Sequence, residues 1–374
     1  MFYMILGAYE PNSAPTNRAL SFIRTLEEKQ VKTEVVFASP NQDHSILTDD
    51  NYKYVQFNYL WKKNNICKSR LISKLFEGLR ISRFARRLQK NDNVFLFGCA
   101  AHLHRFINKY NIKVYHERTE HPYVLKLRFG YAQKRYLNAC KKLTGLFVIS
   151  TSLKKFFVNI GVPKERITIV NMTVDPQRFA GVIKDRDSEK YIAYCGTASN
   201  NKDGVNKLIE AFGIVAHRYH DVKLYIIGKT PSIKDESSNL QLVKSLGIQN
   251  RVVFTGIIPA DKMPQILVNA SVLALARPNN LQAQNGFPTK LGEYLLTGNP
   301  VVVTKVGDIP LFLKDWESAL LADPDSVEEF ADKLCWALEN TEEALNIGNA
   351  GREVALSKFN ASVETLKITD KIIP

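Results

Sequence analysis

The residues with the clearest chemical potential lie within residues 285–304. Gly286 permits a close backbone approach or a positive φ, and Pro288 stands where a first helical residue is favoured. The backbone N–H groups at the start of that helix attract an anion, and Lys290 adds a full positive charge in the first turn. Glu293 follows three residues later and projects from a similar face. The pattern indicates a site for a nucleotide diphosphate, with the phosphate at the helix start and ribose hydroxyls on the carboxylate.

The same stretch also fits a helix that has only a structural role. In that alternative the helix is a capped surface helix, and Lys290 and Glu293 form an exposed ion pair. Leu291 and Leu295 lie on a different face and suit a buried core. Local chemistry leaves both interpretations open, so the elements around the helix have to be considered.

Strand-like apolar runs alternate with amphipathic helices in both halves of the chain. In the first half they cover residues 2–6, 17–29, 33–38, 93–97, 101–109, 113–116 and 145–149. In the second half they cover residues 191–195, 205–218, 222–227, 251–255, 260–269, 272–276, 288–297, 300–304 and 327–339. This alternation predicts an α/β protein with parallel sheets that carry helices on both faces.

The length of 374 residues suggests two domains of ordinary size. Residues 181–190 are polar and poor in apolar side chains, so we expect them to link domains at 1–180 and 191–358. Residues 359–374 are expected to form a terminal helix that returns to the N-terminal domain. Both domains should be doubly wound and Rossmann-like, and the cleft between them is then the default ligand site.

Composition excludes several other classes of protein. Hydrophobic residues make up 45% of the chain and charged residues 24%, which is usual for a globular protein and unlike a disordered or fibrous one. The sequence has no apolar run near the roughly 18–20 residues of a membrane helix, and its start lacks the features of a signal peptide. The five cysteines are scattered, which fits a reducing cytoplasm and gives no metal-ligand spacing. No metal site is therefore expected.

Positive charge is concentrated in the first half of the chain. Residues 1–175 contain 29 Lys and Arg against 13 Asp and Glu, whereas the remainder contains 22 against 24. Residues 68–90 and 126–142 are basic segments with interleaved apolar residues, a pattern attracted to anionic lipid at about 1 kcal/mol per Lys or Arg. They also fit the solvated faces of ordinary helices. Because no RNA-recognition, zinc-finger or helix-turn-helix pattern is present, nucleic acid is not an expected partner.

Residues 285–304 resemble the signature of the family 4 retaining glycosyltransferases, which have the GT-B fold. That signature has two Glu residues separated by seven positions, followed by a helix and a Gly-x-Pro-Val-Val strand. Glu293 matches the second Glu, and Gly298-Asn-Pro-Val-Val matches the ending. Asn285 stands at the first Glu, a position that contacts the donor sugar in the family. Its amide can still bond sugar hydroxyls as donor and acceptor.

A second stretch, residues 195–211, resembles the family's Gly-Arg…Lys-Gly…Leu-Ile-Glu-Ala segment. Lys202 is the best match to the lysine that, together with an arginine, clamps the donor phosphates. Asp203 follows it where the family has Gly, so the match is one residue out of register. Thr197 stands at the arginine position, and Lys290 or Arg277 is the candidate to supply the missing charge.

The resemblance also implies site residues in the first domain. The segment from Gly7 to Arg18 links the first strand to the first helix, and in the family this segment faces the cleft. Gly7 would allow close approach, and Arg18 would meet an anionic group or else lie on a helix surface. Many members carry a His-acid pair near the reacting centre, and the alignment places it close to Glu120. Glu117 and His121 are expected as its neighbours on the acceptor side.

The expected reaction moves a sugar from a nucleotide diphosphate sugar to a hydroxyl acceptor with retention of configuration and without an obligate metal. The second domain would bind the donor and the basic first domain the acceptor. The expected catalytic residues are Lys202, Lys290, Asn285 and Glu120. The expected donor-binding residues are Gly7, Thr197, Arg277, Gly286, Phe287, Pro288, Thr289, Leu291 and Glu293.

The family association further suggests a lipid-linked or polysaccharide acceptor in bacterial surface-glycan synthesis, such as lipopolysaccharide or capsule. We would then expect a cytoplasmic protein held at the inner face of the plasma membrane. Three alternatives remain beside the transferase. They are a GT-B phosphorylase or epimerase, a silent nucleotide-sugar binder, and an adaptor that binds a membrane surface or nucleic acid.

Overall fold

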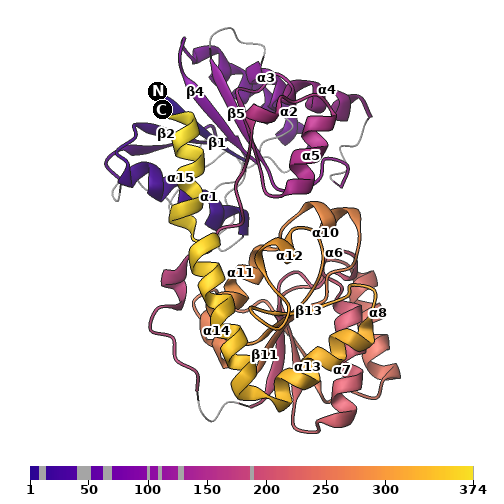
Figure 1. Cartoon of the computed structure of the whole chain (residues 1–374). Coiled ribbons are helices and arrows are strands. Elements are labelled where there is room, and N and C mark those ends of the chain that lie inside the picture. Colours follow the sequence, from indigo (N-terminus) through magenta and orange to yellow (C-terminus); the bar gives the residue numbers. More distant parts are fainter. Residues whose placement is uncertain are drawn as a thin grey trace. The chain divides into compact units, whose positions relative to one another are not determined.

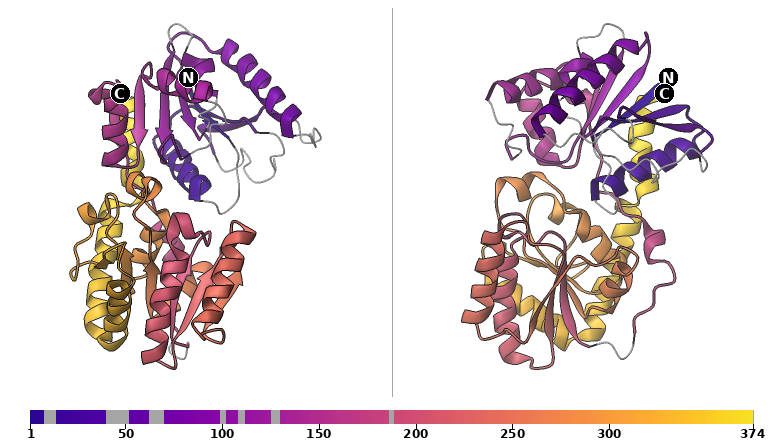
Figure 2. Two further views of the ribbon diagram at one scale, coloured as in Figure 1. Left: turned by 90° about the vertical axis from the view of Figure 1, so that its right-hand side faces the viewer. Right: turned by 180° about the vertical axis from the view of Figure 1, so that it is seen from behind.

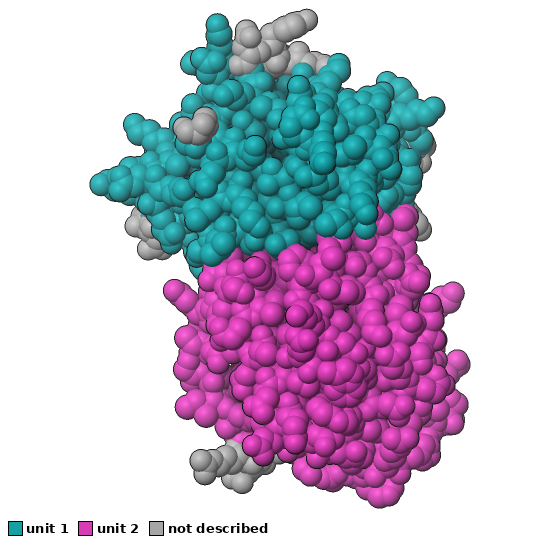
Figure 3. All heavy atoms as spheres, viewed as in Figure 1, with its two compact units in different colours: residues 1–171, 361–374 teal, residues 172–360 magenta. Residues whose placement is uncertain are grey.

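The computed structural model describes residues 1–7, 14–39, 52–61, 70–98, 102–107, 112–124, 130–185 and 189–373. The chain divides into two compact units, Met1–Asn171 with Ala361–Pro374 and Met172–Asn360 (Figure 3). Each unit contains a parallel sheet with helices packed on it (Figures 1 and 2). The α/β class and the two Rossmann-like parallel sheets expected from the sequence are confirmed.

The first unit contains a seven-stranded sheet in the order β3-β2-β1-β4-β5-β6-β7. Its strands are β1 (Phe2–Leu6), β2 (Thr33–Phe37), β3 (Val55–Tyr59), β4 (Asn93–Phe97), β5 (Lys113–Arg118), β6 (Gly145–Val148) and β7 (Ile167–Ile169). Its helices are α1 (Ala14–Glu28), α2 (Arg70–Arg87), α3 (His104–Ile107), α4 (Gly130–Cys140), α5 (Thr151–Asn159), the short 3-10 helix η3 (Lys164–Arg166) and α15 (Ala361–Ile372). The central strand β1 pairs in parallel with β2 and β4.

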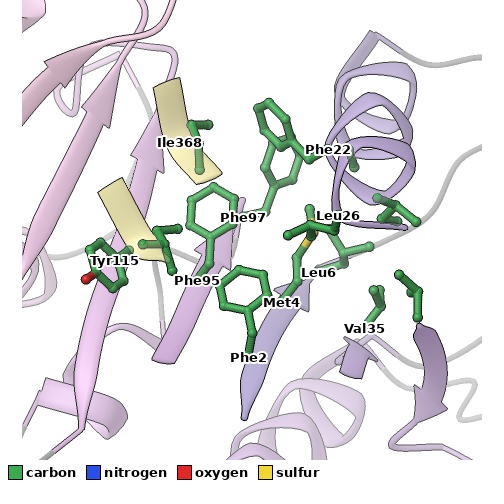
Figure 4. Packing of buried hydrophobic residues seen from close by; sticks show 14 of the residues in the cluster. Phe2, Met4, Leu6, Phe22, Leu26, Val35, Phe95, Phe97, Tyr115 and Ile368 are labelled. Atoms are coloured by element: carbon green, nitrogen blue, oxygen red, sulfur yellow. The ribbon is translucent and has the colours of Figure 1, made fainter. Parts of the chain in front are cut away.

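An aromatic-rich core lies between this sheet and its helices (Figure 4). Phe2, Met4 and Leu6 share one face of β1, because side chains alternate along a strand. Phe22 of α1 packs in the same cluster, and so does Ile368 of α15 from the far end of the chain. The last helix therefore completes the core of the first unit.

The second unit contains a six-stranded sheet in the order β10-β9-β8-β11-β12-β13. Its strands are β8 (Tyr191–Cys195), β9 (Lys223–Ile227), β10 (Val252–Gly256), β11 (Val272–Leu275), β12 (Val301–Thr304) and β13 (Leu320–Ala322). Its helices are η4 (Pro176–Phe179), α6 (Asn200–Asp203), α7 (Val205–Arg218), α8 (Ile233–Ser245), α9 (Met263–Asn269), α10 (Leu281–Asn285), α11 (Thr289–Leu296), α12 (Ile309–Phe312), α13 (Val327–Glu339) and α14 (Thr341–Lys358). The strands β8, β11 and β12 are almost wholly buried, as is typical of parallel strands covered on both faces.

The boundary between the units lies earlier than the expected one. The first unit ends at Asn171 and not at residue 180. The residues that follow are tied to the second unit, where Lys184 Nζ donates to the Ala270 carbonyl at 2.8 Å and Gln265 donates to that of Ile183. Ala270 ends α9, so Lys184 satisfies a carbonyl that helix geometry leaves unpaired. Polar character therefore marks an anchored segment here, and residues 186–188 lie outside the described residues.

The structure describes only part of the basic segments and of the helix expected at residues 101–109. The basic segments 68–90 and 126–142 contain α2 and α4, while residues 68–69 and 126–129 lie outside the described residues. The helix expected at 101–109 is described only as α3. Among the described residues, no helix combines the length and apolar character that crossing a bilayer requires.

Candidate functional site

Three segments of the second unit meet at the carboxyl ends of β8 and β11. They are the loop and short helix after β8, the residues after β11, and the first turn of α11. Gly204 allows two of them to touch, because a Cβ there would overlap the carbonyl oxygen of Ala276. Its φ of +68° adds a second reason for glycine. A Cβ on Gly196 would likewise overlap the ammonium of Lys290.

A buried ionic cluster joins these segments. Asp203, which is 2% exposed, accepts a hydrogen bond from Lys290 Nζ at 2.5 Å. Lys290 Nζ also donates to the Tyr194 hydroxyl at 2.9 Å. Arg277 Nε lies 3.9 Å from the other Asp203 oxygen and donates to the carbonyl of Lys202 at 3.5 Å. One carboxylate is thus shared by two cations at the end of the sheet where ligands of such folds bind.

The electrostatics of the cluster favour charged partners. Burial alone would raise the pKa of Asp203, but Lys290 and Arg277 bring it below its ordinary value. Burial lowers the pKa of Lys290, and Asp203 opposes that effect. Burial next to the carboxylate raises the pKa of Tyr194 well above 10, so this phenol stays neutral. The cluster can therefore keep its positive charge in a dry environment, which suits a phosphate ligand.

The short helix α6 directs the side chains of Lys202 and Asp203 to different surroundings. Ser199 caps it by accepting from the Lys202 N–H at 3.2 Å, and the left-handed Gly204 ends it. Asn280 donates to the Asn201 carbonyl at 2.6 Å and fixes the turn from the other side. Lys202 is partly exposed, whereas Asp203 points into the cluster. The residue that breaks the register with the family is therefore an inward-facing counter-ion, a role that the local sequence does not signal.

The α11 carboxylate has a partner that was not expected. Glu293 forms an ion pair with Arg178 of η4, and both side chains are about a quarter exposed. The segment before η4 packs closely on α11, since a Cβ on Gly292 would overlap Met172 and Val174. Because Lys290 and Glu293 each have a different partner, the alternative of an exposed pair between them is wrong.

Three of the expected donor-site residues around the start of α11 are buried. Asn285 is 8% exposed, and its amide donates to the Leu281 carbonyl at 2.9 Å. Phe287 packs on the rings of Phe312 and Phe359, and Leu291 is fully buried. The side chains of Phe287 and Leu291 serve the core, so the backbone is what these two residues can offer to a ligand.

The start of α11 itself has little internal capping. Its N-cap is Pro288, which gives no side-chain hydrogen bond to the first turn at Thr289 and Lys290. A helix start of this kind is a suitable place for an anion. Thr197 lies on the loop after β8, where its carbonyl accepts a hydrogen bond from the Tyr194 hydroxyl at 2.7 Å.

In the first unit, Arg18 and Glu117 are partners of each other. Arg18 is 4% exposed and donates through Nε and Nη2 to one Glu117 oxygen at 2.9 and 2.7 Å. It also donates to the carbonyls of Val170 and Asn171 at 3.2 and 2.6 Å. The alternative of a surface Arg18 is wrong. The pair joins α1 to β5 and to the last residues of the first unit's continuous part.

The loop after β5 contains the other expected residues of this unit. His121 is 5% exposed and packs edge-on against Tyr123 and Phe156, and burial lowers its pKa. Glu120 is partly exposed, and its carbonyl accepts from Arg118 at 2.7 Å. Gly7 follows β1, and the loop at 8–13 beyond it lies outside the described residues.

Among the described residues, no group of three or more His, Cys, Asp or Glu side chains could hold a metal ion. The neighbouring acidic residues Asp323 and Asp325 form a local hydrogen bond, in which the Asp325 N–H donates to the Asp323 carboxylate at 2.8 Å.

One family model matches part of the second unit. Residues 189–340 match the family model described as "Glycosyl transferases group 1". The chain is 27% identical over 175 residues to N-acetyl-alpha-D-glucosaminyl L-malate synthase of Bacillus anthracis, covering 47% of this chain and 43% of that protein. It is 26% identical over 211 residues to 2-deoxystreptamine glucosyltransferase of Streptomyces kanamyceticus, covering 54% and 52%. The chain spans about half the length of the curated relatives it matches.

Solved structures resemble the whole chain. HepE of Anabaena in complex with UDP superposes with a TM-score of 0.75 over 99% of both chains, at 16% sequence identity. TarM of S. aureus, in a complex that includes UDP, superposes with a TM-score of 0.75 over 100% of this chain and 99% of that one, at 13% identity. At such identities the likeness shows the fold. The second unit is thus similar to the glycosyl transferases group 1 family, and the chain has the GT-B fold.

Proposed function

We propose that this protein is a retaining glycosyltransferase that transfers a sugar from a nucleoside diphosphate sugar to a hydroxyl acceptor. The observation that carries the proposal is the buried cluster of Lys290, Arg277 and Asp203 beside the start of α11. It lies within the residues that match the glycosyl transferases group 1 model. The HepE structures with UDP and with UDP-glucose give the same ligand class in a protein of the same fold.

The proposed chemistry is electrostatic. Negative charge develops on the leaving diphosphate, and Lys202, Lys290 and the start of α11 stabilise it. Removal of one such preorganised contact lowers rates by about 10²–10³ in other enzymes. Asn285 and Glu120 are proposed to act on the sugar and near the acceptor. Because side-chain cations and the helix start supply the positive charge, the reaction is proposed to need no obligate metal.

The acceptor is proposed to be lipid-linked, or an intermediate of a surface polysaccharide, at the inner face of the plasma membrane. Support comes from the helices α2 and α4, whose exposed residues are both basic and apolar. Phe76, Leu79 and Tyr131 are 50%, 62% and 75% exposed, and Arg83 and Arg86 are exposed on the same helix as the first two. Such surfaces bind anionic lipid. Relatives include a phosphatidylinositol monomannoside mannosyltransferase of Mycobacterium tuberculosis.

The first experiment is thermal denaturation with UDP, GDP, ADP and their common sugar conjugates. A bound nucleotide stabilises the folded protein by about 2.7 kcal/mol at a hundredfold excess over its Kd. We expect stabilisation with one base, followed by sugar transfer to a lipid or glycan acceptor with the anomeric configuration retained. Binding without turnover would favour the silent binder, and a requirement for orthophosphate or formation of an epimer would favour the other GT-B enzymes. No stabilisation by any nucleotide would contradict the proposal.

A further inference from the structure

Asp203 is the residue that breaks the register between this chain and the glycosyltransferase pattern, and its surroundings give it a role. It ends α6 immediately before the left-handed Gly204, so its side chain turns inward while that of Lys202 stays partly exposed. Both of its oxygens are engaged, one by Lys290 and Tyr194 and the other by Arg277. Its side chain is 2% exposed.

We propose that Asp203 is a positioning residue of the donor site, whose carboxylate holds the ammonium of Lys290 and the guanidinium of Arg277 in place and charged for a nucleoside diphosphate. This inference rests on the proposed function. The Asp203 carboxylate contacts both cations, so it holds two positive groups side by side at this site. Lys290 keeps 17% of its side chain exposed and thus reaches the surface that a ligand would contact.

The alternative is an ordinary buried ion pair that only stabilises the fold. The two roles differ in what happens to Lys290 when the carboxylate is lost. A buried ammonium beside a guanidinium is desolvated and repelled, and both effects favour its neutral form. Without Asp203, Lys290 should therefore lose its proton within the alkaline range, and an anionic ligand should then bind less tightly.

Among the groups that face Lys290, we expect none to change its protonation before Lys290 does in the alkaline range. Strand β8 contributes Tyr194 and Cys195, and burial raises the pKa of the thiol to about 12. Burial also raises the pKa of Tyr194 and Tyr294 well above 10, so neither phenol ionises before the amine. Asp203 comes from α6, Arg277 follows β11, and Glu293 on α11 is paired with Arg178. The Asp203 carboxyl, whose pKa its cationic partners lower, is already ionised in the alkaline range.

The test measures the affinity for UDP at several pH values in the wild-type protein and in Asp203→Asn. The terminal phosphate of UDP ionises near pH 6 and its uracil N3–H near pH 9, so the affinity of each variant is expressed relative to that of the wild type at the same pH. We expect this relative affinity to fall about tenfold or more between about pH 7.5 and about pH 9.5 for Asp203→Asn. For the double variant Asp203→Asn with Lys290→Arg it should stay constant, because a guanidinium stays charged. An equal loss at every pH, or no loss, would overturn the proposal.

Asp315→Asn is the matched control. Asp315 accepts from the buried Lys333 at 2.7 Å through both oxygens in the same unit, so it is also an aspartate paired with a buried lysine. It belongs to the segment between α12 and β13, and we expect it to leave the affinity for UDP and its pH profile unchanged. A pH-dependent loss in Asp315→Asn as large as in Asp203→Asn would show that any broken pair has this effect.

A second readout separates failure of this inference from failure of the proposed function. Lysines labelled with ¹³C at Cε report their own protonation by NMR, and the Lys290 signal is assigned by its absence in Lys290→Arg. We expect its titration to move down by about one pH unit or more in Asp203→Asn. Absence of UDP binding with this shift present would contradict the proposed function alone, whereas an unmoved titration would contradict the inference. If Asp203→Asn does not fold, Tyr194→Phe removes a hydroxyl that accepts from Lys290, and a smaller downward shift is expected.

Discussion

At the scale of single residues, the candidate site depends on side chains whose roles come from distant partners. Lys290 and Glu293 can be named from local sequence, because charge beside a helix start is a recognisable pattern, whereas Arg277 is named only through the resemblance to the family. The contact of Lys290 with Asp203 joins residues 87 positions apart, and that of Glu293 with Arg178 joins residues 115 apart. Local spacing carries no information about such pairs, so the sequence predicts the cations and the carboxylate but misses what holds them.

Glu293→Ala tests the proposed contact with the ribose. Hydrogen bonds to a charged group contribute about 1.5–3 kcal/mol, so the Kd for UDP should rise about tenfold or more. The measurement is calorimetric titration with UDP and with its 2′-deoxy analogue. Wild-type protein should prefer UDP, and the variant should bind both ligands equally. Arg178→Ala serves as the control, because it leaves the carboxylate in place, and the preference should survive in it. A variant at Glu293 that still prefers UDP would exclude this contact.

Gly204→Ala tests the close approach between α6 and the residues after β11. The substitution forces a side chain into a left-handed conformation and into the Ala276 carbonyl. The conformation alone costs roughly 1–2 kcal/mol, and the overlap adds to it. We therefore expect the free energy of unfolding in urea to fall by about 3 kcal/mol.

Gly247→Ala provides the comparison for that substitution. Gly247 has a φ of +70°, but a Cβ there has open space around it. Its loss of stability should stay near the conformational cost of roughly 1–2 kcal/mol. Equal losses in the two variants would show that the contact with Ala276 has no energetic weight.

At the scale of elements, periodicity predicts the longer buried strands well, but it misses the short buried strand β13 and predicts exposed or charged strands poorly. The edge strand β3 is missed, because only Val55 among its residues is fully buried. Strand β5 runs on to Arg118 through Glu117, where two consecutive charges look like the start of a loop. Arg18 neutralises Glu117 inside the unit, so a tertiary ion pair extends the strand beyond its apparent end.

The exposed arginines of the basic helix α2 are predicted to contribute to the binding of anionic membranes. Arg83, Arg86 and Arg87 are exposed, and each is worth about 1 kcal/mol near an anionic surface. Replacing all three with Gln should weaken binding to vesicles of phosphatidylglycerol and phosphatidylcholine by about a hundredfold at low salt. Flotation of protein with the vesicles measures the change. Apolar Phe76 and Leu79 remain in this variant, so residual binding at high salt would come from them.

A charge-matched control distinguishes a docking face from general electrostatic attraction. Lys234, Lys244 and Lys314 are exposed in the second unit, and their replacement by Gln removes the same total charge. We expect vesicle binding to remain close to that of the wild type. An equal loss in both variants would contradict a membrane face on α2.

At the scale of the whole molecule, the chain forms two units, and the first unit combines residues from both ends of the sequence. The polar stretch at 181–190 suggests a linker, but the apolar Met172 and Val174 already pack on α11. The first unit is completed by α15, where buried Glu364 accepts from the Asn171 N–H at 2.7 Å. A boundary of this kind depends on which surface an apolar side chain meets, and composition cannot show that.

The separate cores of the two units predict different responses to acid. His116 in β5 is fully buried, with its ring nitrogens bonded to the Leu96 carbonyl at 2.9 Å and the Tyr136 hydroxyl at 3.1 Å. Burial lowers its pKa from 6.5 to about 4. The unfolded chain therefore binds a proton at this residue below about pH 6.5, while the folded protein binds it only below about pH 4. Stability of the first unit should decrease by about 3 kcal/mol as the pH falls through that window.

Calorimetry of the wild type and of His116→Asn isolates this contribution from that of the carboxylates. Asparagine can occupy the site without a titrating group, so the variant should be less stable at pH 7 yet lose less stability between about pH 6.5 and about pH 4. Gly204→Ala lowers the stability of the second unit and so identifies which thermal transition belongs to which unit. The difference in acid sensitivity should appear in the transition of the first unit. Parallel pH profiles for wild type and His116→Asn would show that the folded protein protonates this histidine as readily as the unfolded chain does.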